Sequence, residues 1–127
     1  MKKMFLLFSH TLTTAQSKDA QKSFAINDFV LLPSRLQELW SNIPPELESI
    51  EAYLQPLKKY LLSNASKGDA ILIQGDFGGG YHMVNFTKEH NFLALYATTK
   101  RDAQEREEGN VIVKKSVFKH VRFREYL

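Results

Sequence analysis

Four apolar runs along this chain have the length of buried strands, and each is bounded by polar or turn-forming residues. They are residues 4–8, 29–33, 70–75 and 92–98. Their apolar residues are continuous and do not alternate with polar ones, as they would in a strand with one face in water. Continuous runs of this kind are typical of parallel strands that are covered on both sides.

The segments between these runs carry signals for the start of helices. Thr13 or Thr14 with Gln16, and Ser34 with Gln37, have the spacing of a capping box. In that motif a hydroxyl and a side-chain amide bond reciprocally to free backbone N–H groups. We therefore expect one helix to run to about residue 24 and a short second helix to run through residue 40.

A third helix is expected after Pro44, since Pro45 suits the first turn of a helix. Pro56 lies inside its apolar stripe, so we expect a kink or a break near residues 53–55. The stripe itself consists of Leu47, Ile50, Leu54, Leu57 and Leu61.

The rest of the chain predicts one more helix, at residues 80–91, and a β-rich end. The polar residues 99–110 are expected to form a surface loop or a frayed helix. Residues 111–126 read as one or two strands that pair antiparallel at an edge of the sheet. The alternation of strands and helices predicts a single α/β domain over residues 1–127. Its sheet would be Rossmann-like and mostly parallel, with helices on both faces and an antiparallel C-terminal edge.

Composition narrows the class of protein. With 127 residues the chain has room for one globular core. It contains no cysteine, which excludes disulfides and thiolate metal sites. The apolar run at residues 4–8 is too short for a signal peptide, and no run approaches the roughly 20 residues of a membrane span. We therefore expect a soluble, cytoplasmic protein that makes no contact with a membrane.

The formal net charge of +3 is unevenly distributed along the chain. Residues 111–127 contain five lysines and arginines but only one acidic residue. A local basic bias of this kind favours an anionic partner. A solvated terminal strand would explain the same bias without a partner.

The stretch "IQGDFGGGYHMV", residues 73–84, holds four of the six glycines and follows the third strand. Ligands of open parallel sheets collect at this edge, beyond the carboxyl ends of the strands. Gly78, Gly79 and Gly80 would leave N–H groups uncovered at a helix start, which suits a phosphate. Asp76 would repel a phosphate unless it caps the helix, points away or meets a ribose hydroxyl. The pattern is neither a P-loop nor a dinucleotide fingerprint, and a purely structural turn is the alternative.

Two further segments are expected at the same edge of the sheet. Ser9 and His10 follow the first strand. The fourth strand ends in two hydroxyls and two cations, Thr98, Thr99, Lys100 and Arg101. Together with the glycine bend they predict a polar cleft that could hold a phosphate, although each run alone is more typical of a solvated loop.

The end of the chain predicts two faces if side chains alternate with a period of two. One face would hold Val117, Lys119, Val121 and Phe123, and the other Phe118, His120, Arg122 and Arg124. The second face combines an aromatic ring with three potential cations, a composition that binds phosphates and stacks bases. An edge strand that charge protects against aggregation is the alternative.

No metal site and no cofactor are expected. The four histidines, His10, His82, His90 and His120, are scattered, and no pair has the i, i+4 spacing of a helical zinc motif. A Gly-x-Ser-x-Gly nucleophile elbow is also absent from the sequence.

The blocks "LFSHTLT", "LIQGDFGGGYHMVNF", "YATTKR" and "SVFKHVRFREY" resemble a family of small single-domain proteins encoded beside type III CRISPR systems and proposed as ring nucleases. The resemblance spans nearly the whole chain. It implies a Rossmann-like fold related to CRISPR-associated sensor domains, a homodimer, and a cyclic oligoadenylate ligand, chiefly cyclic tetra-adenylate. Such enzymes linearise the ring without a metal and so switch off antiviral signalling. The ribose 2′-hydroxyl attacks the adjacent phosphate and leaves a 2′,3′-cyclic phosphate end.

In such a reaction the substrate supplies the nucleophile, while the protein aligns it and stabilises the charge on the phosphorane. The catalytic candidates are Lys100, Arg122 and His120, with His120 as the general acid. The other predicted ligand-binding residues are Ser9, His10, Gln74, Gly75, Asp76, Phe77, Gly78, Gly79, Gly80, Tyr81, Thr98, Thr99, Arg101, Lys119 and Arg124.

Two other functions are considered for the same residues. A non-catalytic binder of the cyclic nucleotide, either a sponge or a sensor, would use every feature named above and would need no acid–base pair. A module for long RNA or DNA is less consistent with the sequence, because its footprint needs a broader basic surface than a net charge of +3 provides.

Overall fold

The computed structural model describes residues 1–127 and contains one five-stranded sheet. The strand order is β2-β1-β3-β4-β5, and the first four strands run parallel while β5 runs antiparallel to β4. The strands are β1 (Lys3–Leu7), β2 (Asp28–Leu31), β3 (Ala70–Ile73), β4 (Leu93–Glu108) and β5 (Val111–Glu125). The predicted α/β fold, with a mostly parallel sheet and an antiparallel C-terminal edge, is confirmed.

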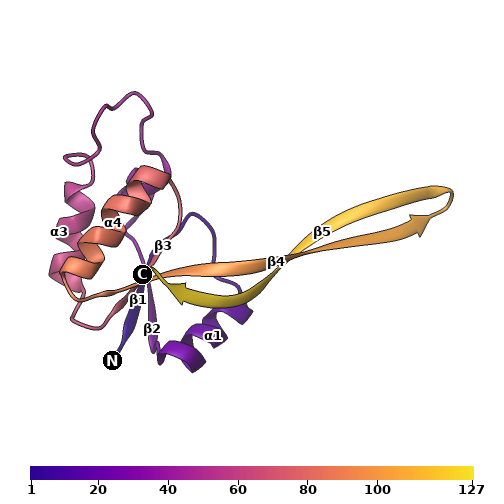
Figure 1. The fold of residues 1–127 in the computed structure, drawn as a ribbon, viewed down its shortest axis with the longest axis horizontal. Helices are drawn as coiled ribbons and strands as arrows, with labels where there is room; N and C mark the ends of the chain where they lie inside the picture. Colours follow the sequence, from indigo (N-terminus) through magenta and orange to yellow (C-terminus); the bar gives the residue numbers. More distant parts are fainter.

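Helices cover both faces of this sheet (Figure 1). Helix α1 (Thr14–Phe24) packs on one face, and α2 (Ser34–Ser41), α3 (Gln55–Asn64) and α4 (Phe77–Glu89) pack on the other. In β3, Ile71 faces the second group of helices while Leu72 faces α1, and every residue of the strand is buried. Burial on both faces accounts for the continuous apolar runs. None of the helices is both long and apolar enough to span a membrane.

The first of the two predicted capping boxes is confirmed. Thr13 Oγ1 accepts a hydrogen bond from Gln16 N at 3.2 Å, and Thr13 N donates to Gln16 Oε1 at 2.9 Å. The second is wrong, because Pro33 is the N-cap of α2 and makes no side-chain cap. The amide of Gln37 donates instead to the backbone oxygen of Phe8, at 3.2 Å, and so ties α2 to the segment after β1.

The helix expected from Pro45 does not form over residues 45–54, and α3 begins at Gln55. The helix therefore starts where the kink or break was expected, and no helical segment precedes it over residues 45–54. Pro56 lies in the first turn of α3, where its missing N–H costs no hydrogen bond. Leu47, a member of the expected apolar stripe, is 42% exposed, since it belongs to the turn segment that precedes α3.

The loop or frayed helix expected at residues 99–110 is wrong. Strand β4 continues to Glu108, turns at Gly109 and Asn110, and returns as β5. Gly109 has a φ of 64°, a conformation that glycine adopts without strain and that two-residue hairpin loops require. The register shifts once, between Thr98 and Thr99, and this leaves Val121 without a partner as a β-bulge.

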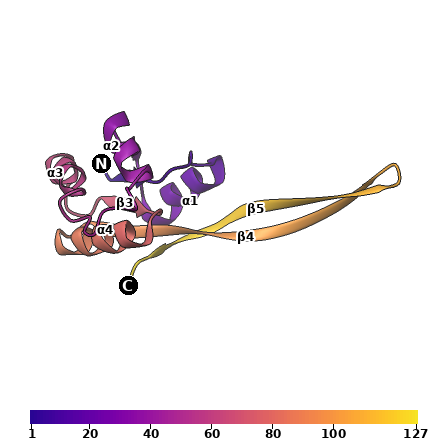
Figure 2. The same ribbon diagram turned by 90° about the horizontal axis from the view of Figure 1, so that it is seen from above.

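The outer part of this hairpin projects well beyond the helices (Figures 1 and 2). We call residues 100–119 the arm and the remaining residues the body. No residue of the arm is buried. Since β4 runs parallel to β3, the arm leaves the sheet at the carboxyl edge of the parallel strands.

Candidate functional site

The triple-glycine bend forms the first turn of α4, which begins at Phe77 and not at Gly80 as expected. A Cβ atom on Gly79 would lie 2.7 Å from Cδ1 of Ile43 and 3.2 Å from the ring of Trp40. Gly79 is therefore needed so that α4 can approach α2 and the segment after it. A Cβ on Gly80 would meet nothing within 4 Å, so Gly80 leaves the surface open.

Asp76 is the N-cap of α4 and occupies part of the expected phosphate cradle. Its Oδ2 accepts from Gly79 N at 2.9 Å, and its backbone oxygen accepts from Gly80 N at 2.7 Å. Two of the three amides that were assigned to a phosphate are thus satisfied within the chain. The prediction of a cradle formed by all three amides is wrong for this reason.

A cavity of about 580 Å³ lies beside the bend, between α4, the end of β3 and the end of the chain. Phe77 and Tyr81 stand one helical turn apart on α4 at its rim, and they are 97% and 71% exposed. Asn85 and Lys88 lie further along the same side of α4 and add polar groups to the lining of the cavity. The full lining is Ile73, Gln74, Gly75, Asp76, Phe77, Gly80, Tyr81, Val84, Asn85, Lys88, Tyr96, Tyr126 and Leu127.

Two tyrosines form the wall of the cavity that faces α4. The rings of Tyr96 and Tyr126 lie 4.7 Å apart between centroids. The hydroxyl of Tyr126 donates to the backbone oxygen of Ile73 at 2.6 Å. Burial, and to a smaller extent Tyr96, raises the pKa of Tyr126, so this hydroxyl stays protonated and keeps the end of the chain against β3.

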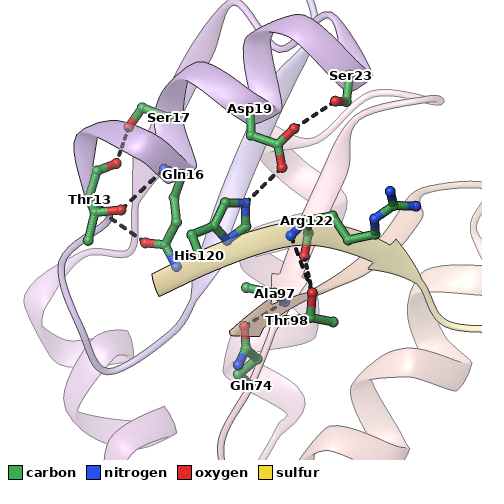
Figure 3. A network of polar contacts seen from close by, with 10 residues as sticks. All are labelled: Thr13, Gln16, Ser17, Asp19, Ser23, Gln74, Ala97, Thr98, His120 and Arg122. Atoms are coloured by element: carbon green, nitrogen blue, oxygen red, sulfur yellow. Dashed lines mark hydrogen bonds and ion pairs between the residues drawn. The ribbon is translucent and has the colours of Figure 1, made fainter. Parts of the chain in front are cut away.

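Gln74 joins the segment after β3 to the base of the hairpin. Its Oε1 accepts from Ala97 N at 2.9 Å (Figure 3), and its backbone oxygen accepts from Nε1 of Trp40 at 3.2 Å. The side chain therefore fixes β4 relative to the glycine bend. Gln74 lines the cavity, but its Oε1 is already engaged by Ala97 N and the side chain is held in place by this bond.

Four cations share the face of the hairpin that borders the cavity. The β-sheet register pairs Tyr96 with Arg124, Thr98 with Arg122, and Lys100 with Lys119, so these residues lie on one side of the two strands. The Arg124 guanidinium stands over the ring of Tyr96, 5.6 Å from its centroid. We call Lys100, Lys119, Arg122 and Arg124 the cationic face; among them only Lys119 has an ionic partner, Asp102 at 3.2 Å.

The bulge at Val121 explains why the predicted faces were wrong. Without it, His120 would share a face with Arg122, and Lys119 would lie on the other side. The extra residue shifts the alternation, so Lys119 joins the arginines and His120 turns to the opposite face, beside Phe123. Phe118 also faces away from the cavity.

His120 packs against α1 on that opposite face. Its Nε2 lies 2.7 Å from Oδ2 of Asp19, and its side chain is only 5% exposed (Figure 3). Burial by itself would raise the pKa of Asp19, but hydrogen bonds from Ser23 and His120 outweigh it and hold that pKa below its ordinary value. His120 is therefore a link between β5 and α1, and this placement does not support it as the general acid.

The other predicted site residues divide between the two sides of the hairpin. Thr98 lies on the side of the cationic face, and its hydroxyl donates to the backbone oxygen of Arg122 at 2.9 Å. Thr99 and Arg101 lie on the opposite side, where Arg101 donates to Oγ of Ser116 through Nε at 3.1 Å. These two residues are not brought to the cavity.

The segment after β1 also remains apart from the cavity. Ser9 forms a hydrogen bond of 2.9 Å with Ser41, oxygen to oxygen, and the exposed His10 ring packs edge-on to Phe8. Neither Ser9 nor His10 lines the cavity beside α4. No three histidine or carboxylate side chains are grouped closely enough to hold a metal ion.

Sequence reasoning missed seven of the thirteen residues that line the cavity, and four of these carry polar groups: Asn85, Lys88, Tyr96 and Tyr126. The first two could have been found, since Phe77, Tyr81, Asn85 and Lys88 recur at helical spacing once α4 starts at Phe77. The two tyrosines could not, because they meet only when β5 pairs with β4.

Comparison with known proteins places this architecture in a family. Residues 2–124 match the family described as "Uncharacterized protein MJ1673 family". The chain is 50% identical over 126 residues to the "Uncharacterized protein MJ1673" of Methanocaldococcus jannaschii, across 99% of this chain and 98% of that protein. No solved structure matches the chain. Because the match covers almost the whole length of both proteins, the chain belongs to the MJ1673 family.

Proposed function

We propose that this protein binds a cyclic oligoadenylate at the cavity and the cationic face, and that it opens the ring by a metal-independent transesterification. The observation that supports this most directly is the continuity of the two surfaces. Exposed aromatic rings line the cavity, and four cations follow from its edge along one side of the hairpin. A ligand with several bases and several phosphates can use both surfaces at once.

The aromatic rings suit adenine bases. Phe77 and Tyr81 are largely exposed and lie one turn apart, so a planar base can stack on either ring or insert between them. Asn85 and Lys88 follow on the same side of the helix and can meet polar atoms of a base or a ribose. The uncovered Gly80 allows a ligand to approach the backbone closely.

The cationic face suits the phosphates. Arg122 and Lys100 stand on successive rows of the hairpin, and neither has an ionic partner within the chain. A guanidinium can bind two phosphate oxygens at once, and a nearby ammonium adds a mobile point charge. Arg124, held over Tyr96, would bind the phosphate nearest to the stacked base.

In the proposed reaction the 2′-oxygen of one ribose bonds to the adjacent phosphorus, and the bond from phosphorus to the 5′-oxygen breaks. The 2′-hydroxyl loses its proton to solvent and the leaving oxygen gains one, giving a 2′,3′-cyclic phosphate and a free 5′-hydroxyl. The protein aligns these atoms and stabilises the added charge on the phosphorane with Arg122 and Lys100. His120 has no part in this scheme, since it is buried against α1.

A non-catalytic binder is the second candidate, and one observation favours it. The only imidazole among the predicted catalytic residues is engaged by Asp19 on the far face of the sheet, so it does not stand beside the cationic face to move a proton. Such a protein would sequester the cyclic nucleotide and lower its free concentration without cleaving it.

The two candidates differ in the fate of the ring. The protein is incubated with cyclic tri-, tetra- and hexa-adenylate in the presence of a chelator, and the nucleotide is chromatographed after denaturation. Linear product with a 2′,3′-cyclic phosphate supports the enzyme, and an intact ring that co-purifies with the protein supports the binder. If titration calorimetry detects no binding of any ring, both candidates are wrong.

Variants connect the result to the proposed residues. Arg122→Ala and Lys100→Ala should each slow single-turnover cleavage by about 10²–10³-fold, the usual loss for one charge-stabilising donor. Tyr81→Ala should weaken binding by roughly 10-fold, in line with the stacking energy of one base. Lys67→Ala is the matched control, because Lys67 is exposed in the turn before β3 and does not line the cavity.

A further inference from the structure

The β-sheet register separates the charges of the hairpin onto two sides. Residues that pair across β4 and β5 point to the same side, and the side alternates from one pair to the next. We call the side that borders the cavity, from the pair Tyr96–Arg124 to the pair Glu108–Val111, the cavity side. Its charged residues are Lys100, Asp102, Arg106, Glu108, Lys115, Lys119, Arg122 and Arg124. Six cations and two carboxylates give this side a net charge of +4.

The opposite side of the arm has no net charge, because two cations there are balanced by two carboxylates. They are Arg101, Lys114, Glu105 and Glu107. Ion pairs stay within each side: Lys119 pairs with Asp102 at 3.2 Å on the cavity side, and Lys114 pairs with Glu105 at 3.7 Å on the other. A net charge of +3 argues against a nucleic-acid partner only if charge is spread evenly over the surface, and here it is not.

A hollow of about 450 Å³ opens on the cavity side of the arm, in addition to the cavity beside α4. Its lining is Gln104, Glu105, Arg106, Val113 and Lys115, and all of these except Glu105 point to the cavity side. Lys115 is exposed and has no ionic partner in the chain. Gln104 lies eight residues along β4 from Tyr96, which is about 27 Å of extended strand. The cationic face therefore lies between the cavity and the hollow.

We propose that the cavity side binds a linear strand of single-stranded RNA, with bases in the cavity and in the hollow and phosphates along the cations between them. Proteins that bind single strands combine a positively charged track for the backbone with aromatic rings on which bases stack. Phe77 and Tyr81 supply exposed rings at one end. From Tyr96 to Arg106 the cations continue for about 33 Å, and a linear strand can follow this whole track.

The distribution of charge favours a single strand over a double helix. A two-stranded ribbon fits into the major groove of a duplex, where phosphates flank it on both sides. Glu105 and Glu107, on the opposite side of the arm, would then face phosphates. A single strand that follows the cavity side avoids both. The two carboxylates on the cavity side, Asp102 and Glu108, are each paired with a cation of the same side.

Hydrogen-bond acceptors between the cations favour RNA over DNA. Asp102 and Gln104 lie on the cavity side between Lys100 and Arg106. A carboxylate or amide oxygen accepts a hydrogen bond from the ribose 2′-hydroxyl, which DNA lacks. We therefore expect RNA to bind more tightly than DNA of the same sequence.

This inference goes beyond the proposed reaction on a cyclic nucleotide, although both ligands would use the cationic face. Lys115 lies four residues from Lys119 on β5, towards the tip of the arm, which is about 13 Å of extended strand. It does not line the cavity. A compact ring at the cavity meets the inner cations, whereas a linear strand continues past Lys115. Substitution of Lys115 therefore tests the strand and leaves the ring site as it is.

Fluorescence anisotropy with the full-length protein tests the RNA site. The probes are end-labelled oligoadenylates of about 4 and about 12 nucleotides, lengths that single-strand sites cover. The longer RNA should bind at least about 10-fold more tightly, because only it reaches the hollow and Lys115. Its plot of log K against log[salt] should have a slope of about −3, from about −0.7 for each of four phosphate contacts. The four cations without an ionic partner are Lys100, Lys115, Arg122 and Arg124.

Two neighbouring lysines on opposite sides of the arm provide the decisive comparison. Lys115→Glu should weaken binding of the longer RNA by at least about 10-fold and make the salt slope shallower by about 0.7 or more, the value of one phosphate contact. Lys114→Glu is the matched control, since it makes the same change in net charge on the opposite side. At about 0.15 M salt, where exposed charges more than about 8 Å apart are screened, it should change the affinity by less than about 2-fold.

The RNA site and the proposed reaction can fail independently. Titration calorimetry should give the same affinity for cyclic tetra-adenylate with Lys115→Glu as with the wild type. If no ring binds but the longer RNA binds and depends on Lys115, the proposed reaction is wrong and the RNA site stands.

Several results would overturn the RNA site. They are no binding of the longer RNA at about 100 µM protein, the weak end of non-specific binding, equal affinity for both lengths, and a duplex that binds more tightly than the single strand. Equal losses for Lys114→Glu and Lys115→Glu would reduce the effect to net charge and would also overturn it. DNA that binds as tightly as RNA would contradict the assignment of RNA and the role of Asp102 and Gln104. Should either variant fail to fold, Lys115→Gln and Lys114→Gln replace them, and only the first should weaken binding, by at least about 3-fold.

Discussion

Strands β3 and β5 are opposite extremes of the same sheet. Every residue of β3 is buried, and its four apolar side chains alternate between two helical layers. Over the arm, β5 has no buried residue, and its side chains alternate between two exposed faces. Both are strands, but the first is stabilised by the hydrophobic effect and the second chiefly by backbone pairing with its neighbour.

The comparison shows that two regions of one small protein can have different sources of order. In the body, removing a side chain leaves a cavity among close-packed neighbours, so single substitutions are costly. In the arm, a side chain is removed from water-exposed surface, so single substitutions cost little until a partner covers it. The junction between the regions, at His120 and Gln74, combines both kinds of contact.

The largest difference is expected between matched truncations in the two regions. Leu72→Ala in β3 should lower the free energy of unfolding by about 2–5 kcal/mol, because Leu72 is fully buried. Ile112→Ala in the arm should change it by less than about 0.5 kcal/mol. Urea unfolding, followed by the fluorescence of the single tryptophan Trp40 at low protein concentration, measures both. Equal losses would show that the arm is part of the cooperative core.

A smaller loss is expected where the hairpin meets α1. His120→Ala should cost about 1–3 kcal/mol, since it leaves the partly buried carboxylate of Asp19 without its 2.7 Å partner. The double variant, His120→Ala with Asp19→Asn, should lose less unfolding free energy than the sum of the losses in the two single variants, because the two side chains act as a pair. Strict additivity would mean that the contact contributes nothing to stability.

The same contact predicts a dependence on pH. The folded pKa of Asp19 lies below its ordinary value of 3.8, so its contribution to stability is present above that value. It is lost as the pH falls through the lower, folded pKa. The difference in unfolding free energy between the wild type and Asp19→Asn should therefore shrink between about pH 6 and about pH 2. A difference that is constant over this range would contradict the assignment.

Little change in stability is expected even from removing most of the arm. Joining Asp102 to Val117, which face each other across the hairpin, through an Asn-Gly turn deletes residues 103–116. The body should keep its unfolding free energy to within about 1 kcal/mol at low concentration, because no deleted residue is buried. The circular dichroism spectrum and the Trp40 fluorescence test this. Loss of the folded signal would show that the arm supports the body.

Local signals were sufficient for most elements of the body. The apolar runs at residues 4–8 and 70–75, the cap at Thr13 and the start of α3 near Pro56 each depend on neighbours in the sequence. The arm has no such pattern, because neither of its faces is buried. Its one local signal is the Gly109-Asn110 pair, which suits a two-residue hairpin turn. The pair lies at the end of the segment that the sequence predicts as a loop and directly before the segment that it predicts as a strand.

The candidate site could be predicted only in part, for a related reason. The sequence shows which segments end at the carboxyl edge, and therefore that Phe77, Tyr81 and the cations of the terminal strand are candidates. It does not show which way they face. Val121 has no partner on β4 and forms a bulge, which puts Lys119 on the side of the cavity and His120 on the opposite side. No local pattern reveals this bulge.

By itself, the sequence determined the fold class, the order of the body's elements and the chemistry available at one edge of the sheet, because burial and capping act over a few neighbouring residues. Only the tertiary structure decided that Asp76 satisfies the amide of Gly79, that His120 binds α1, and that four cations line one side of the hairpin. These outcomes depend on contacts between residues far apart in the chain. Such contacts form only when the sheet fixes the register and the faces of its strands.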